Sequence, residues 1–107
     1  MIITQKVIDI IKSSDEKVTV SIFAPERLKK DWSCRYEIQW PNEKTTRRAH
    51  GLDSAQALVL AIYMVGTDLY CSDFHKNGRM VVEGRPGGFG FPIPRIIRDD
   101  IPGYEDM

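Results

Sequence analysis

The chain has 107 residues, of which 42% are hydrophobic and 28% charged, and its 15 basic and 15 acidic residues give a formal net charge of zero. These values predict one globular domain with its own core. A dedicated nucleic-acid binder usually carries a basic excess that neutralises phosphates, so the balanced charge argues against that class. The 2 cysteines form no disulfide framework and no apolar run could span a bilayer, so we expect a cytoplasmic protein.

Two segments rich in β-branched residues at the start of the chain predict a hairpin. Residues 2–12 fit either a helical face or a strand, and their Ile, Val and Thr side chains favour the strand. A polar turn at 13–17 leads to residues 17–24, in which apolar side chains alternate with others. Pairing of these two strands across the turn is the simplest arrangement.

The clearest pattern is the alternation of residues 32–40, in which every even-numbered side chain is apolar and every odd-numbered one is polar. Side chains of a strand point alternately to its two faces, so this segment predicts a strand with one buried face. A turn then leads to a returning strand at 45–50. A three-residue loop would place Glu37 opposite Arg47 and a four-residue loop would place it opposite Arg48, and the sequence leaves both registers open.

Residues 53–69 predict the main helix. Asp53 is a good N-cap, and Gln56 three residues later completes an arrangement like a capping box. Gly66 lies in mid-helix, where glycine costs about 1 kcal/mol relative to alanine, so we expect another segment to approach closely there. Apolar residues at helical spacing predict an inward stripe formed by Leu58, Ile62, Val65 and Leu69. This stripe is widened by Ala57, Leu60, Ala61 and Met64, so most of the helix surface is expected to be covered.

The last third of the chain is less regular. A turn at Asn77 precedes a short predicted strand at 79–83, a Gly/Pro-rich segment at 84–95 and an acidic tail at 99–107. We predict that residues 1–107 form a single small α+β domain. Its architecture is an antiparallel β-meander of four to five strands, in chain order, with one main α-helix packed on one face.

A resemblance supports this fold. The motif W-x-C at Trp32 and Cys34, followed by G-x-D-S-x-Q-A-L from Gly51 to Leu58, resembles a family of small uncharacterised bacterial proteins, a domain of unknown function. The resemblance runs from the first hairpin to the Gly-rich segment. It favours a strand rather than a helix for residues 2–12. It implies a bacterial origin but no activity, so it transfers no catalytic residue.

The candidate catalytic and metal-binding residues form no recognised motif. Cys71 and His75 are four residues apart and could share a metal ion, but the paired elements of zinc signatures are missing from the sequence. The sequence also has no nucleophile elbow. We therefore predict no metal, no cofactor and a non-enzymatic role. The alternative is a small-ligand binder or enzyme with a pocket near His50, Asp53 and Cys71.

Two groups of residues are candidates for binding. Phe89 and Phe91 could form an exposed aromatic–proline ledge for a protein partner, although packing across the sheet or helix is the favoured structural interpretation. Arg47, Arg48 and Arg85 could converge on an anion, or could lie on a solvated sheet face. We predict a protein-interaction module, immunity- or antitoxin-like in one form. Its partner would be another protein or a second copy, and neither a membrane nor nucleic acid.

Overall fold

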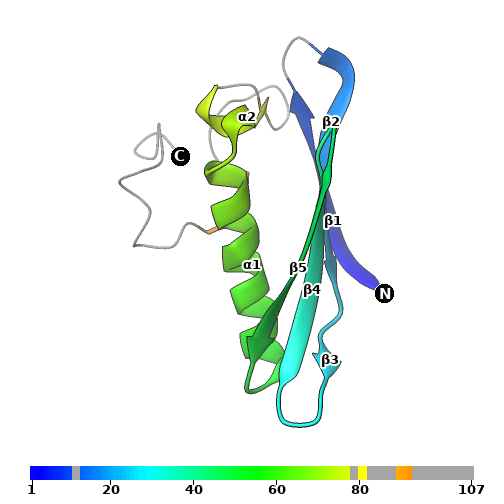
Figure 1. Cartoon of the computed structure of the whole chain (residues 1–107), viewed down its shortest axis with the longest axis vertical. Helices are drawn as coiled ribbons and strands as arrows, with labels where there is room; N and C mark the ends of the chain where they lie inside the picture. Colours follow the sequence, from blue (N-terminus) through cyan, green and yellow to red (C-terminus); the bar gives the residue numbers. More distant parts are fainter. Residues whose placement is uncertain (11–12, 78–79, 82–88, 93–107) are drawn as a thin grey trace.

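The structure is a computed structural model and describes residues 1–10, 13–77, 80–81 and 89–92. It has the predicted α+β fold, in which one long helix lies against one face of an antiparallel sheet (Figure 1). The described residues contribute six strands: β1 (Ile2–Ile10), β2 (Ser13–Phe23), β3 (Glu26–Arg27), β4 (Trp32–Gln39), β5 (Lys44–Gly51) and β6 (Met80–Val81). The strands β1, β2, β4 and β5 are antiparallel neighbours in chain order, as predicted, while β3 also pairs with β4 and β6 pairs with β1.

The first hairpin begins its second strand earlier than the sequence predicts. We predicted a turn at 13–17, but β2 already starts at Ser13 and Lys17 lies opposite Asp9 of β1. Lys17 Nζ is 2.7 Å from Asp9 Oδ1. Strand pairing satisfies the hydrogen-bonding groups of the backbone whatever the side chains are. Exposed polar residues such as Glu16 can therefore continue the strand.

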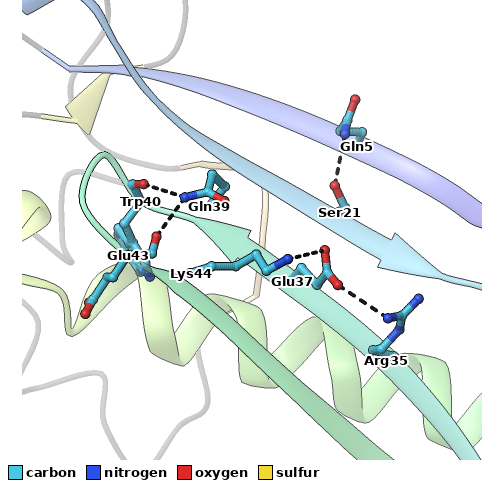
Figure 2. Close-up of polar contacts among 8 residues, drawn as sticks. All are labelled: Gln5, Ser21, Arg35, Glu37, Gln39, Trp40, Glu43 and Lys44. Atoms are coloured by element: carbon cyan, nitrogen blue, oxygen red, sulfur yellow. Dashed lines mark hydrogen bonds and ion pairs between the residues drawn. The ribbon is translucent and has the colours of Figure 1, made fainter.

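The second hairpin turns over two residues instead of three or four. The backbone N–H of Trp40 donates to the carbonyl oxygen of Glu43 at 2.8 Å, so only Pro41 and Asn42 lie beyond this closing hydrogen bond. Figure 2 shows that the side-chain amide of Gln39 donates to the carbonyl oxygens of Trp40 and Glu43, both at 2.9 Å. These bonds tighten the reversal that proline and asparagine allow.

The shorter turn changes the pairing of the two strands. Glu37 lies opposite Thr46, so both predicted registers, with Arg47 or Arg48 opposite Glu37, are wrong. Each residue removed from the turn shifts the partner by one position and moves its side chain to the other face. The Glu37 carboxylate instead pairs with two cations of its own face (Figure 2), Arg35 at 3.4 Å and Lys44 at 3.9 Å.

The long helix α1 (Ser54–Tyr70) begins where the capping pattern predicts. The Oδ1 atom of Asp53 accepts a hydrogen bond from the backbone N–H of Gln56 at 2.7 Å. The Oε1 atom of Gln56 accepts in turn from the backbone N–H of Leu52 at 2.6 Å. Both bonds satisfy donors at the helix start. A single short helix, α2 (Asp73–Lys76), follows in the described part of the chain, and no described helix is long and apolar enough to cross a membrane.

The buried side of α1 is rotated from the predicted stripe. Leu58 and Ile62 are only partly buried at the rim of the core, so they are not its centre as predicted. The fully or nearly fully buried positions of the helix are Ala57, Ala61, Val65, Gly66, Leu69 and Tyr70. The two small alanine side chains allow the helix to lie close to β4 and β5, against which α1 mainly packs.

Residues 89–92 pack beside α1, and the expected close approach at Gly66 is confirmed. A Cβ atom added to Gly66 would overlap the carbonyl oxygen of Pro92. Gly90 has a φ of +85° and lies near the Nζ atom of Lys6 in β1, where a side chain would be strained. Glycine is therefore favoured at position 66 by the close backbone contact and at position 90 by the positive φ.

Candidate interaction surface

The outer side of α1 is exposed to solvent but carries no charge. Between Asp53 and Asp68 the sequence contains no charged residue. Three neighbouring side chains on this side are exposed, Val59 at 49%, Leu60 at 41% and Tyr63 at 39%, and we call them the apolar face. A solvent-facing helix surface in a globular protein is normally charged or polar, so the apolar face is a candidate contact surface.

The strand β5 forms the edge of the sheet next to α1 (Figure 1). Among the described residues it pairs only with β4. It contains three cationic residues and no acidic one. Because strand side chains alternate, Arg47 lies on the face covered by α1, opposite Tyr36, while Arg48 and His50 lie on the open face. The edge strand is therefore basic on both faces.

A groove of about 310 Å³ runs between β5 and α1, and we call it the β5–α1 groove. Arg47, Arg48 and His50 line it from the strand, and Leu60 and Tyr63 line it from the helix. The predicted binding residues Arg47 and Arg48 thus lie beside exposed apolar side chains that the sequence analysis did not single out. The third predicted arginine, at position 85, lies outside the described residues.

The two open-face residues of the groove make long contacts with acidic side chains in the described part of the chain. Arg48 Nη1 lies 3.8 Å from Glu26 Oε2, and His50 Nδ1 lies 3.6 Å from Asp31 Oδ2. Arg48 Nη1 also donates to the hydroxyl of Ser33 at 3.3 Å. Long ion pairs between exposed side chains contribute about 0–1 kcal/mol, so a ligand can replace these partners at little cost.

Arg47, in contrast, is held by the single charged residue of α1. Its Nη1 atom lies 2.8 Å from Asp68 Oδ1, and the buried hydroxyl of Tyr36 donates to Asp68 Oδ2. Burial raises the pKa of the Tyr36 hydroxyl above its ordinary value of 10.0, and the hydrogen bond to Asp68 raises it further. Asp68 thus joins the helix to β4 and β5 and fixes one wall of the groove.

We expect the free energy of unfolding to fall as the pH rises above 10. The folded-state pKa of Tyr36 is raised, so above the ordinary value of 10.0 the unfolded chain loses a proton that the folded chain retains. Stability that is fully present below pH 10 is therefore lost with increasing pH. Urea unfolding from about pH 8 to about pH 11 measures the slope. Tyr36→Phe should flatten it, leaving the part due to Tyr70, whose pKa burial also raises, and an unchanged slope would contradict this account.

A second, larger cavity of about 630 Å³ lies at the C-terminal end of α1. It is lined by Cys71 and by the rings of Trp40 and Phe74, which stack with centroids 5.8 Å apart. His50 and Asp53, which we predicted to share a pocket with Cys71, do not line it. Asp53 caps the opposite end of a 17-residue helix, about 25 Å away at 1.5 Å per residue. The structure therefore does not bring the three residues together.

The two cysteines have different surroundings. Cys34 is buried, its Sγ atom donates to the carbonyl oxygen of Phe23 at 3.3 Å, and burial raises the pKa of its thiol. Cys71 is exposed. Within the described part of the chain, no three His, Cys, Asp or Glu side chains come together as a possible metal site. A pairing of Cys71 with the side chain of His75 lies outside the described side chains.

The predicted aromatic–proline ledge would need both phenylalanine rings at the surface. The Phe89 ring is fully buried and stacks on Tyr70, with centroids 5.0 Å apart. The backbone N–H of Phe89 donates to the Tyr70 hydroxyl at 2.8 Å, and Phe91 packs partly buried against the core. These described residues favour the structural interpretation, and the rest of the 84–95 segment and the 99–107 tail lie outside the description.

Comparison with known proteins adds a family but no activity. No curated protein and no solved structure matches the chain. The model of the domain of unknown function DUF6968 matches residues 4–93, which extend from β1 beyond the last described residue, Pro92. This match confirms the predicted membership of a family without an assigned function. The chain belongs to the DUF6968 family.

Proposed function

We propose that this protein is a non-enzymatic module that binds another protein through the apolar face of α1. The observation that carries the proposal is the exposure of Val59, Leu60 and Tyr63 side by side on a helix surface without charge. Partner contact removes such apolar area from water, which contributes roughly 25 cal/mol per Å². Tyrosine is also enriched at protein interfaces, because its ring is large and rigid and its hydroxyl remains able to hydrogen-bond.

A bacterial cytoplasmic setting fits this function. The described free cysteines, Cys34 and Cys71, suit a reducing compartment. An immunity- or antitoxin-like role is one form of the proposal, and the partner would then be a toxin whose surface is covered by the apolar face.

The test compares two substitutions of equally exposed valines. Val59 of the apolar face and Val7 of β1 are both 49% exposed. Val59→Lys places a charge in the proposed interface, whereas Val7→Lys places the same charge on the far side of the sheet. The wild-type protein and both variants are used to purify partners from the native cells, and the purified partner is then titrated against each of them.

We expect the partner to bind the wild type and the Val7→Lys variant and to lose at least about tenfold in affinity for Val59→Lys. All three proteins should show the same melting temperature within a few degrees, because both valines are exposed. A partner that binds the Val59→Lys variant as tightly as the wild type would contradict the proposal.

Small-ligand binding in the cavity beside Cys71 is a second candidate function. Its volume of about 630 Å³ lies within the range of about 300–1,000 Å³ found for ligand sites, and Trp40 and Phe74 supply stacked aromatic walls. A metabolite screen that follows the tryptophan fluorescence of the chain tests it. A hit must lose its effect in Cys71→Phe, which narrows the cavity without adding a tryptophan, and a hit that binds this variant equally well would exclude the cavity.

A further inference from the structure

We propose that the β5–α1 groove binds an extended segment of a partner protein, added as a strand to the edge of β5, in which acidic and apolar residues alternate. The proposal rests on the proposed function and specifies the partner's chemistry. Three features of the groove carry it: the backbone edge of β5 that no other described strand pairs with, the charge of its open face, and the apolar wall formed by α1.

The backbone edge follows from the hydrogen-bond pattern of the hairpin. The bond from Trp40 N–H to the Glu43 carbonyl makes these two residues a hydrogen-bonded pair. Hydrogen-bonded and non-bonded pairs alternate along an antiparallel ladder, so in this register every second residue of β5 bonds to β4. The residues whose N–H and C=O groups point away from β4 are Lys44, Thr46, Arg48 and His50. These groups can bind the backbone of an added strand.

The charge of the open face selects acidic side chains. An added strand would place every second side chain beside Arg48, His50 and Lys44 on this face. Directly opposed or diagonal side chains of neighbouring strands interact, and opposite charges stabilise the pair. The acidic partners of Arg48 and His50 among the described residues lie at 3.8 Å and 3.6 Å, so an incoming carboxylate competes with weak contacts.

The helix wall selects apolar side chains. The alternate side chains of the added strand would point to the other face of the sheet, toward α1. There the groove is lined by Leu60, Tyr63 and Met64. Leu60 and Tyr63 are exposed, so an apolar side chain would cover surface that is otherwise wet. The two walls together specify the alternation of acidic and apolar residues.

The basic charge of β5 also argues against a second copy as the occupant. Pairing of two β5 edges would bring Lys44, Arg47 and Arg48 of one chain against the same residues of the other. Cations on an edge strand oppose such self-pairing. The same charges attract an acidic strand, so they favour an acidic partner segment over a second copy of this chain.

The probe is a fluorescently labelled peptide of seven residues in which valine alternates with glutamate. Its binding to the full chain is measured by anisotropy, together with two control peptides. In the first, lysine replaces glutamate. In the second, the backbone amides that would face β5 are N-methylated, so that they cannot donate hydrogen bonds to the strand. The protein variants are Arg48→Glu in the groove and Lys17→Glu, an equally large charge change at an exposed residue of β2.

We expect the glutamate peptide to bind, with Arg48→Glu weakening it about tenfold and Lys17→Glu changing it less than about twofold. Neither control peptide should bind. Absence of binding at about 1 mM, equal binding of the lysine or N-methylated peptide, or equal losses in both variants would each overturn the inference. If Val59→Lys still loses the native partner while the peptide fails, the proposed function stands and the strand addition is wrong.

Discussion

Replacing Val65 by aspartate should leave the chain unfolded at room temperature. Val65 has no exposed surface and lies on the buried side of α1, so the substitution would place a charge in the core without a partner. Burial of an unpaired carboxylate in an apolar core costs more than about 4 kcal/mol. Small domains have a total stability of about 5–15 kcal/mol, so little folded protein would remain. Circular dichroism and urea titration measure the loss.

The matched control is Leu60→Asp on the same helix. Leu60 is exposed at the outer side, so the same charge there stays in water and should change stability by less than about 1 kcal/mol. A folded Val65→Asp protein with a cooperative transition near that of the wild type would mean that the buried side of α1 has been assigned wrongly.

Gly66→Ala should destabilise the protein, although the same change in an exposed helix usually stabilises it. The helix propensity of alanine favours the variant by about 1 kcal/mol. Its Cβ atom, however, would overlap the Pro92 carbonyl oxygen, which is backbone and cannot rotate away. Overpacking of this kind costs typically about 1–3 kcal/mol, and relief by displacing residues 89–92 would remove Phe89 from Tyr70. We therefore expect a net loss of up to about 2 kcal/mol in urea unfolding.

Hydrogen exchange of the Phe89 amide separates the effect of helix propensity from the effect of the overlap with Pro92. This amide is bonded to the Tyr70 hydroxyl, and it should exchange much faster in the Gly66→Ala variant if the segment has been displaced. A variant that gains about 1 kcal/mol and keeps the amide protected would show that propensity alone decides, and that Pro92 does not lie against the helix.

The main elements could be predicted because they depend on local chemistry. The alternation of residues 32–40 indicates β4, and Asp53 with Gln56 marks the start of α1. The strand register could not be predicted in the same way, because a turn one residue shorter moves every later partner by one position. That single residue decides that Arg47, rather than Arg48, faces Asp68 of the helix.

The packing of residues 89–92 and of α1 depends on contacts between residues far apart in the sequence, which local sequence patterns do not predict. Gly66 indicated a close neighbour, but only the fold shows that the neighbour is Pro92, 26 positions later in the chain. The predicted stripe had Leu58 and Ile62 at its centre and the two alanines at its margin, whereas the structure buries Ala57 and Ala61 fully, because small side chains let the helix approach the sheet.

The candidate site was predicted only in part. Arg47 and Arg48 were identified by charge. Their proposed role in binding, however, depends on their position at a sheet edge beside a helix, which is a property of the tertiary structure. Leu60 and Tyr63 were missed because apolar residues around a helix were interpreted as buried. The signal that could have found them is the absence of charge from Ser54 to Thr67, since a helix at a protein surface normally carries charged residues outside.

Amide hydrogen exchange of the free protein is the measurement that tests the open edge of β5 most directly. We predict an alternating pattern along the strand, in which Thr46, Arg48 and His50 exchange fast and Arg47 and Ala49 exchange slowly, because only the latter donate to β4. Addition of the glutamate peptide should slow the first three amides and leave the others unchanged. Uniformly slow exchange along β5 in the free protein would contradict the account, since the edge would then already be paired.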